Sequence, residues 1–219
     1  MTPIWPRSTA SVLATIFLLP GVAYPLPANA APAQLPTPNP LALARAELRQ
    51  LRVATPRPLS TYERDKFMTE WGHGDNPCDT REIVLLRDAR RVRPNADCRV
   101  TTGIWYSPYD GRRLTNASQI DVDHLVPLAN AWISGANTWS AAKRHAFAND
   151  LTRPELVAVS ETANLDKGGH SPANWRPPRR EYWCTYARAW ITVKHHYRLT
   201  VTSREKSALY AMLGTCPTP

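Results

Sequence analysis

Apolar and acidic positions alternate over a short central segment of the chain. Residues 120–123 read Ile-Asp-Val-Asp, the period-two pattern of a half-buried strand. Residues 156–159 form a wholly apolar run of strand length, and a helix is expected to follow from Thr162. Between the two runs, residues 127–150 have helical composition. The pattern therefore predicts two strands and a helix, interrupted by a helical insertion.

Further elements are predicted on both sides of this centre by capping residues and by apolar positions at helical spacing. Side chains that can cap a helix stand at four expected starts: Ser60 or Thr61, Asp79 or Thr80, Thr138, and Thr202. The helix from position 60 or 61 should run to Met68, the longest helix should span 180–197, and the last should span 203–213. A strand-like run followed by a Pro-Tyr-Asp-Gly turn predicts a hairpin over 99–114.

The N-terminal part differs in composition from the rest. Residues 1–30 hold one charged residue, Arg7, an apolar run and an Ala-Asn-Ala end, which together are typical of a cleaved secretory signal. The apolar run is short for a membrane span, and an uncleaved anchor is the alternative. Residues 31–58 are rich in proline and predict an extended linker with a short helix at 41–53. Residues 59–219 remain as one domain of a secreted protein without stable membrane association.

Cysteine usage agrees with export. The four cysteines are Cys78, Cys98, Cys184 and Cys216, and no two are spaced as C-x-x-C, so a zinc knuckle is not expected. An even number of cysteines in an exported chain favours disulfides, and four cysteines allow three pairings. We expect nearest neighbours to pair, Cys78 with Cys98 and Cys184 with Cys216.

The formal net charge of the chain is +9. A basic exported protein suits a polyanionic partner such as nucleic acid, teichoic acid or an acidic polysaccharide. Charge alone does not choose among these partners, because a merely soluble basic surface gives the same count.

Residues suited to metal-assisted phosphodiester cleavage lie where the central elements end. Asp123 and His124 close the first central strand, and Asn164 and Lys167 stand on the following helix. Such cleavage needs an activated water and relief of charge on the phosphate and the leaving oxygen, which a divalent metal can supply. Asp123 and Asn164 offer oxygen ligands of the kind that Mg²⁺ or Mn²⁺ prefers, and an imidazole can take a proton near neutral pH. If the strand breaks at Asp123, as Pro127 suggests, His124 can face the same phosphate.

Several segments together resemble the HNH, or ββα-metal, nucleases. They are CDTREIVLLRD, TGIWYSPYDG, DVDHLVPLANAWISGA, FANDL, LVAVSETANLDKG and PANWRPP, followed by the pair of C-terminal helices. The resemblance covers most of residues 75–216. It is strongest to exported HNH endonuclease-family proteins of the actinobacterial type, which are related to the C-terminal nuclease domain of GmrSD restriction enzymes.

This resemblance implies an α+β fold with a ββα-metal core, a helical insertion and flanking helices. It places the general base on His124 and one divalent metal, Mg²⁺ first and Mn²⁺ or another ion next, on Asp123 and Asn164. The middle asparagine of the HNH pattern is replaced by Glu155, which we do not assign as a ligand and which can cap or pair in its place. His170 follows two glycines and is read as a loop residue rather than a ligand.

Basic residues near the motif are candidates for substrate binding. Lys167 is either a phosphate contact or a structural clamp. Arg176, Arg179 and Arg180, in the run Arg-Pro-Pro-Arg-Arg, are the first choice for contacting phosphates, with an exposed basic loop as the alternative. Phosphate contacts dominate the affinity of proteins for nucleic acids and convey no sequence information.

The sequence thus predicts a secreted endonuclease that hydrolyses DNA, with RNA as a further candidate, at low sequence specificity and with 5′-phosphate products. Two alternatives stay open: an exported non-catalytic protein that binds polyanions on an HNH scaffold, and a metallohydrolase that acts on another phosphodiester, such as a wall polymer. The oligomeric state does not follow from the sequence.

Overall fold

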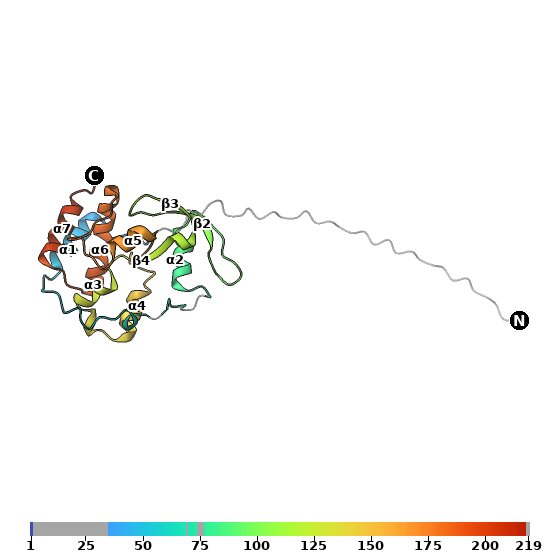
Figure 1. The fold of residues 1–219 in the computed structure, drawn as a ribbon, viewed down its shortest axis with the longest axis horizontal. Helices are drawn as coiled ribbons and strands as arrows, with labels where there is room; N and C mark the ends of the chain where they lie inside the picture. Colours follow the sequence, from blue (N-terminus) through green and yellow to red (C-terminus); the bar gives the residue numbers. More distant parts are fainter. Residues whose placement is uncertain (2–34, 69, 74–76, 218–219) are drawn as a thin grey trace. The chain divides into compact units, whose positions relative to one another are not determined.

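Two small antiparallel sheets lie beside a group of helices, so the chain has the predicted α+β class (Figure 1). The computed structural model describes Met1 and residues 35–68, 70–73 and 77–217. Apart from Met1, the predicted signal at 1–30 falls outside these residues and stays a prediction. Within the described part of the chain, no helix is long and apolar enough to cross a bilayer.

The first sheet precedes the motif in the sequence. Its strands β1 (Arg91–Val92), β2 (Thr102–Tyr106) and β3 (Arg113–Asn116) pair in this order, and all pairs are antiparallel. β2 and β3 form the hairpin expected over 99–114. Gly111 adopts φ +76° in its turn, a conformation that glycine reaches without steric strain.

The second sheet consists of β4 (Ile120–His124) and β5 (Leu156–Ser160), which run antiparallel with Asp123 opposite Val157. Successive side chains of a strand point to opposite faces, so the two faces bury different residues. Val122 belongs to a hydrophobic cluster that includes residues of α2 (Thr80–Asp88) and of the first sheet. Val157 on the other face belongs to the larger cluster that the helices build. The motif strand therefore separates two cores.

The outer edge of β5 is closed by side chains rather than by a third strand. Asp88 accepts a hydrogen bond from the backbone N–H of Ala158 at 2.9 Å, and Arg87 donates to the carbonyl of Leu156 at 2.6 Å. Both come from the end of α2, whose start is capped by the Asp79 carboxylate as predicted. Since an unpaired strand edge leaves polar groups exposed, this pair fixes β5 in place.

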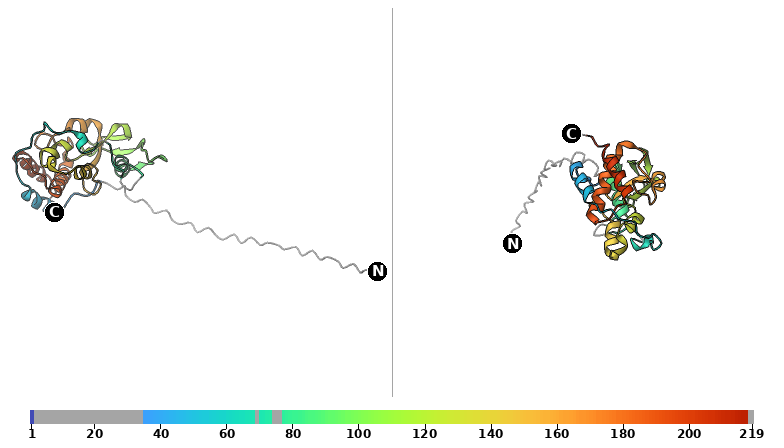
Figure 2. Two further views of the ribbon diagram at one scale, coloured as in Figure 1. Left: turned by 90° about the horizontal axis from the view of Figure 1, so that it is seen from below. Right: turned by 90° about the vertical axis from the view of Figure 1, so that its left-hand side faces the viewer.

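The helices α1 (Leu41–Gln50), α6 (Trp183–Tyr197) and α7 (Ser203–Leu213) pack against one another. Two further views keep α1, in blue, beside the orange-red α6 and α7 (Figure 2). The short helix expected in the proline-rich segment thus forms as α1, and its buried Leu48 belongs to the same core as α6. The predicted capping box opens α7, where Thr202 accepts from the N–H of Glu205.

Helix starts elsewhere differ from the expectation. The helix predicted to run to Met68 is a single 3₁₀ turn, η1 (Arg64–Lys66), so that prediction is wrong. Its expected caps, Ser60 and Thr61, lie outside any helix, and a three-residue turn adds few hydrogen bonds to offset the cost of nucleation. The helix expected from Trp139 begins two residues later, because Ser140 rather than Thr138 accepts the capping hydrogen bond from Lys143.

The remaining elements follow the chain in order. They are η2 (Ala117–Gln119), α3 (Leu128–Ile133), η3 (Ala136–Thr138), α4 (Ala141–Ala148), α5 (Glu161–Lys167) and η4 (Arg180–Tyr182), the last of which leads into α6. The helical insertion predicted between the two motif strands is thus formed by α3, η3 and α4.

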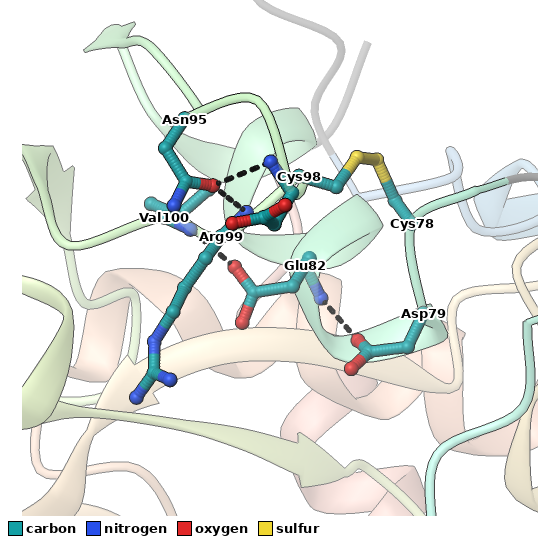
Figure 3. Close-up of a disulfide and its surroundings, with 8 residues drawn as sticks. Cys78, Asp79, Glu82, Asn95, Cys98, Arg99 and Val100 are labelled. Atoms are coloured by element: carbon teal, nitrogen blue, oxygen red, sulfur yellow. Dashed lines mark hydrogen bonds between the residues drawn. A yellow bond between two sulfur atoms is a disulfide. The ribbon is translucent and has the colours of Figure 1, made fainter.

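Both predicted disulfides form. Cys78–Cys98 ties the residue before the cap of α2 to the loop that precedes β2, and Figure 3 shows this bridge with its neighbours. The Glu82 carboxylate also holds that loop, because it accepts the N–H of Val100 at 2.6 Å. Cys184–Cys216 joins α6 to the C-terminal segment.

We expect the double substitution Cys184→Ser/Cys216→Ser to lower the free energy of unfolding by about 2–4 kcal/mol. The bridge closes a sequence separation of 32 residues, so its loss returns conformational entropy to the unfolded chain. Urea denaturation of the oxidised protein and of the variant measures the difference. An unchanged midpoint would show that the helices hold the tail without the bridge.

Candidate active site

Asp123 and His124 leave β4 on opposite faces. Both pair with β5, Asp123 with Val157 and His124 with Leu156, so the strand runs through the motif. The break expected at Asp123 does not occur, and that expectation is wrong. The turn comes only after Leu125, whose N–H donates to the carbonyl of Glu155 at 2.6 Å.

The Asp123 side chain is buried in a polar contact with α5, which lies beside β4 (Figure 1). Its exposed fraction is 6%, and that of Lys167 is 0%. The Lys167 ammonium lies 2.8 Å from Asp123 Oδ1 and also donates to the carbonyl of His124 at 2.9 Å. The Tyr109 hydroxyl donates to Asp123 Oδ2 at 2.5 Å. Burial raises the pKa of Asp123, and the Lys167 charge and these hydrogen bonds offset part of the rise.

This contact places Lys167 between α5 and β4 and favours the structural clamp, while a phosphate contact stays a prediction. A lysine without solvent exposure, bound to Asp123 and to the backbone of His124, serves as a clamp between α5 and β4. Its position on the helix follows from the start of α5, where Ser160 accepts the N–H of Ala163. Gly168 then ends the helix with φ +48°.

His124 points to the opposite face of β4 from Asp123, and one of its ring nitrogens is hydrogen-bonded. Nε2 is 2.9 Å from the carbonyl oxygen of Ala148, and only an N–H can donate to that oxygen. In the neutral ring, Nδ1 is therefore the unprotonated nitrogen. Burial lowers the pKa of His124 to about 3, and the positive charges of Arg64 and Lys167 add to the effect. The imidazole is neutral near pH 7 and can accept a proton at Nδ1.

Trp71 fixes the plane of this imidazole. The two rings stack with centroids 5.5 Å apart and planes inclined by 7°. The neighbouring Gly72 is held on both sides, since its N–H donates to Asn149 at 2.9 Å and its carbonyl accepts from the Thr80 hydroxyl at 2.8 Å. The end of α4 thus holds the imidazole through two contacts. Ala148 binds the ring directly, and Asn149 binds Gly72, the neighbour of the stacked Trp71.

Sequence reasoning did not identify Trp71 as part of the site. Trp71 stands outside any predicted helix or strand. Trp71 is far from His124 in the sequence, so no local pattern predicts that the two rings stack. The neighbouring Gly72 is a local sign that the backbone can approach another segment closely.

Glu155 holds the loop that follows the motif. The side chain has an exposed fraction of 0%, and its Oε2 accepts the N–H of Val126 at 3.1 Å. Its Oε1 has no hydrogen-bond partner among the described residues. Burial raises the pKa of Glu155 well above its usual range. The residue that replaces the middle asparagine therefore binds the backbone of the motif loop.

Asn164 is joined to the motif strand through Asp121. Its amide nitrogen donates to Asp121 Oδ2 at 2.9 Å, and Asp121 shares the face of β4 that Asp123 occupies. An amide that donates through nitrogen leaves its carbonyl oxygen available as an acceptor. Asp121 is a residue that sequence reasoning named only as part of the motif, although its period-two spacing from Asp123 was visible.

These side chains suit a hard divalent cation. Asp121, Asp123 and Asn164 present carboxylate and amide oxygens, and a carboxylate that accepts two hydrogen bonds keeps about two of its four lone-pair sites. Mg²⁺ and Mn²⁺ prefer such oxygens, and Mg²⁺ usually takes one or two carboxylates and keeps several waters. Within the described ranges, no three His, Cys, Asp or Glu side chains gather around one point where they could hold a metal ion.

The predicted phosphate-binding arginines lie in the segment after α5. Arg179 and Arg180 are exposed, and Arg176 is half-buried. The guanidinium groups of Arg176 and Arg180 lie 5.2 and 5.1 Å from the centre of the Trp183 ring. The backbone N–H of Arg179 donates to the carbonyl of Tyr109 at 2.9 Å, which ties this basic segment to the residue that binds Asp123.

The same stretch of chain is matched by known proteins. Residues 80–212 match the family model described as GmrSD restriction endonucleases, C-terminal domain. An uncharacterized secreted protein of Arthroderma benhamiae is 48% identical over 190 residues, which cover 85% of this chain and 93% of that protein. No solved structure matches the chain.

Proposed function

Because the chain belongs to the family of GmrSD restriction endonuclease C-terminal domains, as its motifs predicted, we propose that it is a secreted, metal-dependent endonuclease. Its substrate is DNA, with RNA as a second candidate. Cleavage has little sequence preference, because arginine contacts to phosphates convey no sequence information. The secreted relative and the two disulfides support action outside the cell.

The observation on which the proposal rests is the state of His124. The hydrogen bond from Nε2–H to the Ala148 carbonyl fixes the tautomer, so Nδ1 is the nitrogen that can accept a proton, as a general base requires. The proposed oxygen ligands stand on the opposite face of the same strand and on α5, so the proposal requires the water at His124 and the metal at Asp123 to meet around the end of β4, which stops at His124. We assign β4, β5 and α5 to a ββα-metal core, with the insertion between its strands.

In this proposal the divalent metal, Mg²⁺ first, is held by Asp123 and Asn164, with Asp121 as a further oxygen donor. When bound, it stabilises negative charge on the phosphate and the leaving oxygen. His124 takes a proton from the attacking water at Nδ1, while Trp71 and Ala148 keep the ring in one orientation. Lys167 and Tyr109 position the Asp123 carboxylate. Arg176, Arg179 and Arg180 bind phosphates of the substrate.

The proposal is tested with mature protein, starting at residue 31, and supercoiled plasmid. We expect nicked and then linear plasmid in Mg²⁺ or Mn²⁺, no cleavage in EDTA, and renewed cleavage when metal is restored in excess. Intact plasmid that is retarded on a gel under every metal would favour the non-catalytic binding protein. Intact, unretarded plasmid together with cleavage of a teichoic-acid-type polymer would favour the wall-polymer hydrolase.

A further inference from the structure

A polar pocket of about 320 Å³ lies away from the Asp123–His124 pair. Its walls come from four places: residues 54–56, the end of α3 with Ser134, the loop after α5, and the segment 200–205 that leads into α7. The polar groups that line it and matter below are Asn130, Ser134, His170, Ser171, Thr202 and Arg204. His170, which is not part of the proposed metal site, is thus one of the residues that line this separate pocket.

Asn130 is a buried side chain with free donors at this pocket. Its exposed fraction is 5%. The Ser134 hydroxyl shares its one hydrogen between the backbone carbonyl of Asn130 and the amide oxygen, 3.2 Å away, and the amide nitrogen lies on the other side of the group. Within the described part of the chain, that nitrogen donates no hydrogen bond to protein. On a side chain that is otherwise buried, an amide nitrogen without a protein acceptor at the wall of a pocket can donate to a ligand there.

The start of α7 adds backbone donors to the same pocket. The capping box satisfies the N–H groups of Glu205 and Thr202. The N–H groups of Ser203 and Arg204 belong to the first turn of this eleven-residue helix and have no intrahelical acceptor. The helix dipole makes this end favourable for an anion.

The charges around the pocket have the sign that an anion needs. Arg204 is exposed at its rim. The acid in the wall, Glu205, is neutralised, because its Oε1 lies 2.8 Å from the buried Lys194 ammonium and accepts from the Trp190 indole at 2.7 Å. The pocket therefore presents hydrogen-bond donors and the positive charge of Arg204. The charge of the Glu205 carboxylate is balanced by Lys194.

We propose that this pocket binds a phosphate group, either as free phosphate or as a phosphodiester of a nucleic-acid strand. Oxygens of a tetrahedral anion can accept from the Asn130 amide, the free N–H groups of α7 and the Arg204 guanidinium together. The loop with His170 follows directly from α5, which bears Asn164. The nucleic-acid source rests on the proposed function: a strand engaged at Asn164 would place a second phosphate here, outside the cleaved bond. The free-phosphate source does not depend on it.

The test uses wild-type protein in EDTA, so that no cleavage takes place and a failure of the nuclease assignment leaves the result unaffected. Inorganic phosphate is titrated while the amide resonances of Ser203 and Arg204 are followed by NMR. We expect saturable shifts of both, and affinities reduced about tenfold or more in Arg204→Gln and Asn130→Asp. Asn130→Asp keeps the acceptor for Ser134 and replaces the donor by a charge that repels an anion. Arg45→Gln, on the exposed face of α1, is the matched control and should bind as the wild type does.

A short single-stranded oligonucleotide identifies the source of the phosphate. Oligonucleotide that shifts the same amides and competes with phosphate supports the strand as ligand, and phosphate binding without such competition supports the free anion. Absence of saturable shifts at millimolar phosphate would overturn the proposal. So would equal affinity in Arg204→Gln and Asn130→Asp, with folding of both confirmed by thermal unfolding.

Discussion

We expect Lys167→Met to lower the free energy of unfolding by about 3–5 kcal/mol. The substitution leaves the Asp123 carboxylate buried without its ammonium partner, with the Tyr109 hydroxyl as its remaining donor among the contacts described. It also removes a hydrogen bond to the carbonyl of His124. Removing one partner of a buried ion pair is strongly destabilising, because the other charge stays desolvated. Urea denaturation monitored by tryptophan fluorescence measures the loss.

Two further variants separate this cause from the loss of a lysine as such. Lys143→Met removes an exposed lysine from α4 and should change the free energy of unfolding by less than about 1 kcal/mol. The double variant Asp123→Asn/Lys167→Met removes both charges and should recover a large part of the stability. A Lys167→Met protein as stable as the wild type would show that Asp123 is not charged in the folded state.

Local patterns predicted the elements that build the site. The alternation at 120–123 marks β4, because successive side chains of a strand face opposite sides, and the wholly apolar run at 156–159 marks β5, which is buried on both faces. Asp79 and the Thr202–Glu205 box mark the starts of α2 and α7, because capping acts over three residues. These signals depend on neighbours in the sequence, which is why they could be read from it.

Contacts between distant segments could not be read in this way. Tyr109 binds Asp123 from the hairpin turn, and Trp71 covers His124 from a segment without periodicity. His124 is also bound by the backbone carbonyl of Ala148. Every residue type has such a carbonyl, so the sequence gives no sign of this contact. These three groups set the protonation and orientation of the motif residues, so the chemistry of the site was less predictable than its position.

The places where the structure departs from the local patterns or adds to them have a common physical reason. The strand was expected to break at Asp123 because of Pro127, but Glu155 binds the N–H of Val126 and lets the pairing continue to His124. The amide nitrogen of Asn164 donates to Asp121, a contact that local sequence did not indicate, and the role of Asn164 as a metal ligand stays a prediction. In both cases a tertiary hydrogen bond decided an outcome that local sequence left open.

The central claim is that His124 is the base of a phosphodiesterase reaction. Replacing it should reduce the cleavage rate by about 10²–10⁴-fold, the usual contribution of general acid–base catalysis. His124→Ala also removes the ring that packs on Trp71 and so has a structural effect. His124→Gln is the sharper variant, because its amide can still donate to the carbonyl of Ala148 and offers no basic nitrogen.

The most direct measurement is the initial rate of plasmid cleavage in saturating Mn²⁺ by the wild type, His124→Gln and His196→Ala. His196 is an exposed histidine of α6 and serves as the matched control. We predict that His124→Gln retains the wild-type melting temperature within a few degrees and loses at least about 10²-fold in rate, while His196→Ala cleaves as the wild type does. A folded His124→Gln protein that cleaves plasmid at the wild-type rate would contradict the assignment.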